Sequence, residues 1–135
     1  ISVRVRALPG RPVLVELRDT PNFAVGDAAW DLGRPLAELG LAPAATIRLT
    51  GPDGDAEAAV ATAGDAPLVV VGRDVPRHQW QLDLWRRLRA ARADAVLVDL
   101  GLPRPDALAD GPYVLVGGAA RPNLLVAAEI LVRGH

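Results

Sequence analysis

The chain has 135 residues, the length of one ordinary domain, and half of them are hydrophobic, so it can bury a sizeable core. Its net charge of -1 disfavours strong non-specific nucleic-acid binding, and its lack of cysteine excludes disulfides and thiolate metal sites. No apolar run approaches the roughly 20 residues that cross a membrane. The absence of methionine leads us to expect that the sequence starts inside a longer polypeptide or after processing.

Strands and helices are predicted to alternate from the start of the chain. Residues 1–7 alternate between apolar and polar side chains, which indicates a strand with one wet face, at a sheet edge or running antiparallel. The apolar run 13–17 is predicted to be the first core strand, and a helix is expected around 31–39, ended by Gly40. Residues 45–50 form the second predicted core strand.

The middle of the chain is predicted to hold a strand, a helix and another strand. Before it, Asp55 is placed to cap a short helix over 56–63. The run 68–72 is too short and too rich in valine for a helix, so it is predicted to be a strand buried on both faces. After Pro76 the apolar residues recur at helical spacing, with Gln81 expected on the opposite, polar face. That apolar stripe comprises Trp80, Leu82, Leu84, Trp85, Leu88 and Ala91.

The last third of the chain completes the fold prediction. A core strand over 95–100 is followed by an irregular crossover over 101–111, a strand over 113–116 and an apolar helix over 123–133. This alternation predicts a three-layer, doubly wound α/β domain with a mainly parallel, flavodoxin-like sheet. We expect five core strands in the order 2-1-3-4-5, with strand 68–72 at the centre and the N-terminal strand as an addition.

A candidate site is predicted where the strands end, because ligands of open α/β sheets bind beyond the carboxyl ends of the strands. The loops predicted to lie there are 18–26, 73–78, 101–105 and 117–123. The loop 73–78 carries the most charge, and 18–26 lies beside it if their preceding strands are parallel neighbours. We call this predicted site the strand-end rim, and it comprises Asn22, Arg73, Asp74, Arg77 and His78.

The residues of the strand-end rim allow two interpretations. They suit an acidic or sugar ligand, or a pair in which Asp74 orients His78 as a proton carrier. Alternatively, Asp74 caps the following helix, the arginines are simply solvated, and His78 packs at a domain contact. The sequence leaves both interpretations open.

Motifs for other chemistries are incomplete in this sequence. Gly117-Gly118 follows a predicted strand, as in phosphate-binding turns, but the rest of the G-x-G-x-x-G pattern is missing. There is no Gly-x-Ser-x-Gly elbow, and one of the two histidines is the terminal His135, so serine triads and metal clusters are poorly supported. No motif positions a pair of carboxylates for glycoside chemistry. We therefore expect no cofactor, and no active site in this domain standing alone.

Several segments of the chain resemble one known family. They are residues 12–18 (PVLVELR), Pro21-Asn22 with Gly26 and Trp30, residues 68–88 (LVVVGRDVPRHQWQLDLWRRL), 95–105 (AVLVDLGLPRP) and 127–134 (AAEILVRG). Together they resemble the C-terminal α/β domain of family 3 glycoside hydrolases, and they are most similar to actinobacterial β-N-acetylhexosaminidases. The resemblance covers residues 12–134.

The resemblance implies a domain without catalytic residues of its own. Such enzymes remove β-linked N-acetylglucosamine, and their nucleophilic aspartate and His-Asp acid/base pair lie on an N-terminal TIM barrel that has no counterpart here. Residues 1–135 are thus expected to form a single α/β domain that packs against the catalytic barrel of its parent protein and helps to shape the substrate cleft. Carbohydrate is an expected ligand, whereas nucleic acid and membranes are not expected partners. The alternative is a free-standing flavodoxin-like module that binds a sugar or nucleotide.

Overall fold

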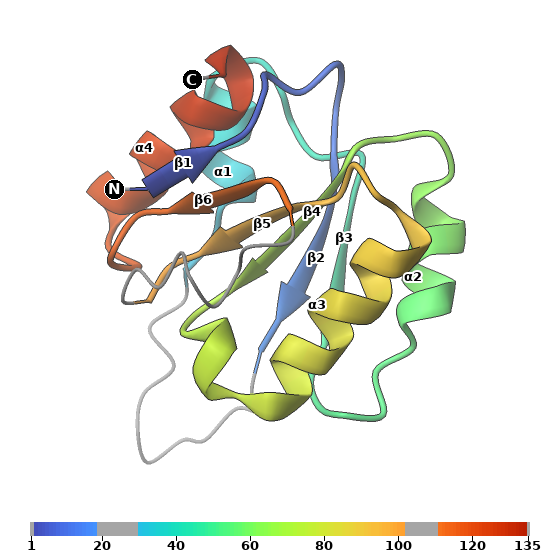
Figure 1. Ribbon diagram of the computed structural model, residues 1–135. Helices are drawn as coiled ribbons and strands as arrows, with labels where there is room; N and C mark the ends of the chain where they lie inside the picture. Colours follow the sequence, from blue (N-terminus) through green and yellow to red (C-terminus); the bar gives the residue numbers. More distant parts are fainter. Residues whose placement is uncertain (1, 19–29, 102–110, 135) are drawn as a thin grey trace.

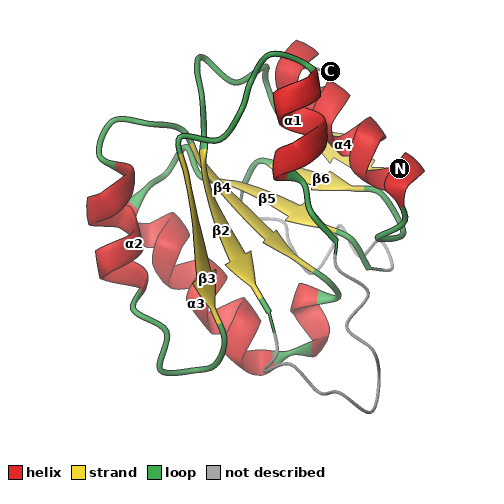
Figure 2. Ribbon diagram, turned by 180° about the vertical axis from the view of Figure 1, so that it is seen from behind, coloured by secondary structure: helices red, strands yellow, loops and turns green. Residues whose placement is uncertain are grey.

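The structure of the protein is a computed structural model that describes residues 2–18, 30–101 and 111–134. In these ranges a mixed sheet lies between two layers of helices (Figure 1, Figure 2). The strands are β1 (Ser2–Arg4), β2 (Val13–Leu17), β3 (Ala45–Leu49), β4 (Leu68–Gly72), β5 (Val96–Asp99) and β6 (Tyr113–Leu115). The helices are α1 (Gly33–Glu38), α2 (Ala56–Ala63), the 3₁₀ helix η1 (Val75–Arg77), α3 (Gln79–Ala91) and α4 (Arg121–Arg133).

The sheet has the strand order β1-β6-β5-β4-β2-β3. Strands β2 to β6 pair in parallel, and β1 pairs antiparallel with β6 at the edge. This arrangement confirms the predicted three-layer α/β fold, including the 2-1-3-4-5 order of the core strands and the edge position of the N-terminal strand. The central strand β4 is buried along its whole length, as its three valines predicted.

Each face of the sheet is covered by its own pair of helices. Helices α2 and α3 pack on one face, where their alanine, leucine and tryptophan side chains meet alternate residues of β2 and β4. Helices α1 and α4 cover the other face, over the remaining alternate residues of the same strands. The alternation follows from the strand period of two, which sends successive side chains to opposite faces.

Helix α3 differs from its prediction in the face that it buries. Its buried residues are Gln81, Leu84, Trp85 and Leu88, which lie at the spacing i, i+3, i+4, i+7. Trp80 is partly buried and packs against the core cluster on this face, as predicted, whereas Ala91 is exposed, so the prediction for the far end of the stripe was wrong. The prediction that Gln81 lies on the opposite, polar face was also wrong, because Gln81 is 2% exposed and is the first residue of the buried face. A stripe traced through apolar residues alone leaves it out.

Helix boundaries follow local capping chemistry. The backbone N–H of Ala58 donates to the Asp55 carboxylate at 2.9 Å, which confirms the predicted cap of α2. Helix α1 begins at Gly33, later than predicted, because the Asp31 carboxylate accepts the Gly33 N–H at 2.9 Å. Helix α4 begins earlier than predicted, since Pro122 is well accommodated in a first helical turn. No helix within the described ranges is long and apolar enough to span a bilayer.

Candidate functional site

The structure gathers four of the predicted site residues in the short loop that follows β4. Arg73 and Arg77 are exposed, and Asp74 and His78 are partly buried. Figure 1 shows that β4 leads into η1 at the carboxyl ends of the parallel strands. Asn22, the fifth residue of the strand-end rim, lies outside the described residues.

The backbone of this loop is fixed from the neighbouring strand. Asp74 adopts a left-handed conformation with φ 57°, and its N–H donates to Oδ1 of Asp99 at 2.8 Å. The same oxygen accepts the N–H of Gly101 at 2.9 Å. Any side chain at position 101 would overlap the Asp74 carboxylate, so glycine is needed where the two loops meet. Asp99 therefore joins the loops that follow β4 and β5.

The interpretation in which the Asp74 side chain caps the following helix is not supported, although Asp74 is the residue that precedes η1. The Asp74 side chain makes no capping hydrogen bond to η1, and α3 begins after His78, whose side chain does not cap that helix either. Asp74 has a left-handed backbone conformation, and its N–H donates a hydrogen bond to Asp99 that holds the turn in place.

Asp99 is a buried carboxyl group in an unusual environment. Its side chain is 1% exposed, and burial raises its pKa, with the charge of nearby Asp74 adding to the rise and backbone N–H groups opposing it. Its Oδ2 atom has no hydrogen-bond partner in the described structure, and neither has Oε1 of Gln81, which is also buried. The two lie near Gly72: this glycine aligns with Asp99 in the sheet, and a Cβ on it would lie 3.2 Å from Gln81 Oε1.

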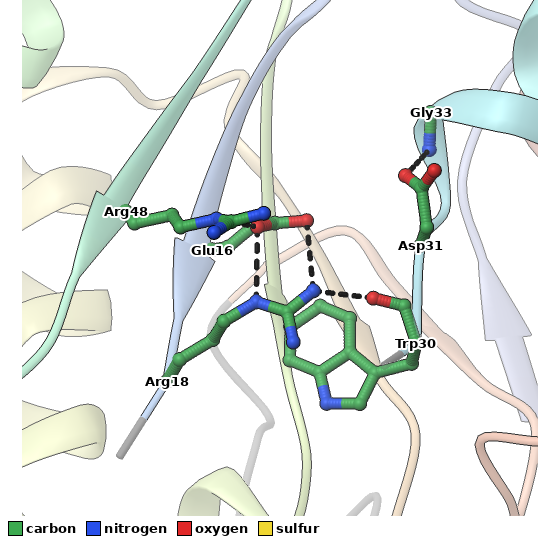
Figure 3. A network of polar contacts seen from close by, with 6 residues as sticks. All are labelled: Glu16, Arg18, Trp30, Asp31, Gly33 and Arg48. Carbon is green, nitrogen blue, oxygen red and sulfur yellow. Dashed lines mark hydrogen bonds and ion pairs between the residues drawn. The ribbon is translucent and has the colours of Figure 1, made fainter. Parts of the chain in front are cut away.

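A second polar cluster lies at the ends of β2 and β3 (Figure 3). Glu16 is 2% exposed, and its carboxylate accepts from Arg18 at 3.0 and 3.3 Å and from Nε of Arg48 at 3.0 Å. Arg18 also donates to the backbone carbonyl of Trp30, and its guanidinium lies 3.7 Å from the centre of the Trp30 ring. We call these four residues the Glu16 cluster.

Sequence reasoning missed the Glu16 cluster, although a signal was present. A glutamate in the middle of an apolar strand that is buried on both faces needs a cationic partner. Arg48 is its neighbour in register on β3, but that pairing depends on the strand order. The distant partner Trp30 lies 12 positions after Arg18 in the sequence, so only the folded chain brings it to β2.

The two clusters differ in what they offer to a ligand. The Arg18 side chain is 12% exposed and is committed to Glu16 and Trp30, whereas Arg48 is 68% exposed and keeps outward-facing N–H donors. Arg73 and Arg77 are likewise exposed beyond β4. Guanidinium groups are thus exposed at the carboxyl edge of the sheet, together with the carboxylates of Asp53 and Asp55 after β3, whereas Glu16 and Asp99 are buried. In the described part of the chain, no group of three or more histidine, cysteine or acidic residues is arranged to hold a metal ion.

Comparison with solved structures finds a similar fold within part of a larger enzyme. The chain is similar to a glycoside hydrolase family 3 beta-N-acetylglucosaminidase from Paenibacillus sp. str. FPU-7, with a TM-score of 0.69 over 96% of this chain. What the two share is the fold. Their sequences are 18% identical over the match, and the chain spans 28% of the length of that enzyme. Comparisons with models of protein families and with curated proteins found no match.

Proposed function

We propose that this chain is the non-catalytic C-terminal domain of a family 3 glycoside hydrolase that removes β-linked N-acetylglucosamine. The observation that carries the proposal is the asymmetry of the structural match, which takes in 96% of this chain and 28% of a family 3 enzyme. A domain of a multidomain enzyme produces such a match. The segment resemblance over residues 12–134 supports the same family independently of the fold.

The chemistry of the carboxyl edge supports a non-catalytic role. Retaining glycosidases need two carboxyl groups about 5 Å apart beside an open cleft, and inverting ones need a wider pair. Asp99 is closed off from solvent, with one oxygen bound to two backbone N–H groups. Glu16 is enclosed by two arginines. In the described residues, both buried carboxylates of this edge are therefore committed to holding the structure.

The strand-end rim suits a contact with the catalytic barrel. Exposed arginines pair with carboxylates and sugar hydroxyls without deep burial, because the guanidinium offers several N–H donors in one plane. Arg73 and Arg77 are exposed on the loop after β4, which a hydrogen bond from the Asp74 N–H to the Asp99 side chain holds in place. The backbone of this loop is therefore ordered before a partner binds. Such ordering lowers the entropic cost of docking.

Kinetics of the parent protein test the role of the rim. In the chain joined to its barrel, Arg73→Ala and His78→Ala are expected to raise the KM for an aryl N-acetylglucosaminide or to weaken docking of the two domains. For Arg73→Ala the effect is expected to be up to about fivefold, since an exposed charged contact contributes about 0.2–1 kcal/mol. Arg86→Ala, an exposed arginine on α3, is the matched control.

Two results would count against the proposal. Unchanged kcat, KM and docking in both rim variants would leave the rim without a role at the barrel. Saturable binding of N-acetylglucosamine or a nucleotide to the isolated chain would instead favour a free-standing binding module.

A further inference from the structure

A single buried oxygen atom, Oδ1 of Asp99, holds the backbone that follows both β4 and β5. It accepts the N–H of Asp74 at 2.8 Å and the N–H of Gly101 at 2.9 Å. Asp99 is 1% exposed, so a partner that docks on the surface of the domain does not touch it. Any effect of Asp99 on a partner therefore passes through the residues that it holds.

The bond from Asp74 to Asp99 supports the whole turn that leads into α3. Asp74 has φ 57°, a conformation that residues other than glycine adopt only with support from their surroundings. Its carbonyl accepts the Arg77 N–H at 2.9 Å, and the Val75 carbonyl accepts the His78 N–H at 3.1 Å, which closes η1. Arg73 directly precedes Asp74, so both exposed arginines of the strand-end rim are attached to this turn.

The turn packs closely against the ends of the two strands. A Cβ on Gly72 would overlap the Val75 side chain, which is fully buried, and a Cβ on Gly101 would overlap the Asp74 carboxylate. Val75 thus fixes the position of η1 through packing in the core, whereas Asp99 fixes the left-handed residue before it through a hydrogen bond. The directions in which Arg73 and Arg77 leave the backbone depend on that residue.

We propose that Asp99 is a positioning residue for domain docking, which places Arg73 and Arg77 toward the partner by holding the Asp74 turn. The inference rests on the docking role proposed above for the strand-end rim, and it adds a residue that contacts neither barrel nor substrate. The property that matters is the acceptor oxygen. Asparagine can therefore replace Asp99 in this role, and alanine cannot.

Amide hydrogen exchange of the isotope-labelled chain, followed by NMR, tests the positioning of the turn. In Asp99→Ala the amides of Asp74 and Gly101 lose their acceptor, and their exchange is expected to become about tenfold faster, together with that of Arg77 and His78. Asp99→Ser is the second variant, because its hydroxyl is too short to replace the carboxylate oxygen. Asp99→Asn should keep these amides protected.

A core variant controls for a general loss of stability. Leu131→Ala truncates a buried residue of α4 on the opposite face of the sheet. It is expected to speed exchange of the slowest core amides and to leave the amides of the Asp74 turn unchanged, since the turn exchanges through local opening.

A double-mutant cycle in the chain joined to its barrel tests the link between Asp99 and Arg73. Asp99→Ala is expected to raise the KM for an aryl N-acetylglucosaminide, or to weaken docking, at least as much as Arg73→Ala does, with kcat unchanged. The double variant should be no worse than the more impaired single variant, because a displaced turn has already removed the Arg73 contact. Asp99→Asn should behave as the wild type.

Three results would overturn the inference. They are unchanged exchange of the turn in both Asp99→Ala and Asp99→Ser, effects of Asp99→Ala and Arg73→Ala that multiply in the double variant, and equal losses for Asp99→Asn and Asp99→Ala. A different result would count against the docking role alone. If exchange of the turn becomes faster but neither Arg73→Ala nor Asp99→Ala changes KM or docking, Asp99 positions the turn and the rim has no role at the barrel.

Discussion

Two buried carboxylates at the carboxyl ends of the strands are stabilised by different means. Glu16 is neutralised by Arg18 and Arg48, and burial of its charge is offset by ion pairs. Asp99 has backbone N–H groups for one oxygen and an unpartnered second oxygen, and burial raises its pKa. Removing the charge of Glu16 should therefore destabilise the protein. Removing the charge of Asp99 should stabilise it, because that charge is buried without a counter-ion.

Asp99→Asn is expected to stabilise the protein at neutral pH relative to the wild type. The folded state binds the Asp99 proton more tightly than the unfolded state does, because its pKa is raised. The contribution of Asp99 to stability is thus largest below its ordinary pKa of 3.8 and is lost as the pH rises through the raised value. Asparagine keeps an oxygen for the N–H groups of Asp74 and Gly101 and carries no charge.

Urea denaturation of both proteins between pH 3 and pH 8 measures this effect. The stability difference between Asp99→Asn and the wild type should grow as the pH rises. Asp83→Asn, on the exposed side of α3, serves as the control. A difference for Asp99→Asn that stays constant across the pH range would show that Asp99 does not titrate as described.

Glu16→Gln is expected to destabilise the protein by about 3–5 kcal/mol, because it leaves the enclosed Arg18 charge without its counter-ion. Glu57→Gln breaks an exposed pair with Arg87 and should cost at most about 1 kcal/mol. Denaturant midpoints of the two variants give the comparison. Equal, small losses of stability in the two variants would mean that water hydrates the Arg18 guanidinium well enough in the absence of Glu16.

Among the elements, α3 links the core to the strand-end rim. Its face contributes Leu84, Trp85 and Leu88 to the cluster on the sheet, while its first turn directly follows the rim residue His78. Trp85 is 4% exposed, whereas Trp80 is only partly buried at the margin of the same cluster. The two tryptophans of this helix should therefore differ in their contribution to stability.

Trp85→Ala is expected to cost about 3–5 kcal/mol, the usual range for deleting a buried tryptophan side chain. Trp80→Ala should cost less, about 1–2 kcal/mol, since part of its ring remains in water when the domain is folded. Thermal and chemical unfolding of both variants decide the order. A larger loss for Trp80 would contradict the burial pattern of α3.

At the scale of the whole molecule, the sheet separates two polar edges. The carboxyl edge carries the strand-end rim and the Glu16 cluster, and the exposed residues Arg4 and Arg6 lie at the amino edge. At the carboxyl edge Asp53 and Asp55 are exposed as well, whereas Glu16 and Asp99 are buried and bonded within the domain.

The chain by itself is expected to fold and yet not to hydrolyse an aryl N-acetylglucosaminide. Its described residues form hydrophobic clusters on both faces of the sheet, and the buried carboxylates Glu16 and Asp99 are bonded within the domain. Release of the aryl group is measured by absorbance against buffer and against heat-denatured protein. Turnover that a single substitution in this chain abolished would refute this expectation.

The sequence by itself determined the alternation of strands and helices, the parallel sheet and the order of its core strands. Apolar runs of valine and leucine report burial on both faces directly, and the chain connections then restrict the topology. The charged loop after β4 was also predictable, because Arg73 to His78 are neighbours in sequence.

Only the tertiary structure decided which polar residues lie inside and which residues distant in the chain meet. Gln81, Glu16 and Asp99 are buried because strands and helices close over them, and residue type alone favours exposure for all three. The bond from Asp74 to Asp99 spans 25 positions and the contact of Arg48 with Glu16 spans 32, so both depend on strand register. Local periodicity reports which way a side chain points, whereas the partner that it meets is set by how the elements pack.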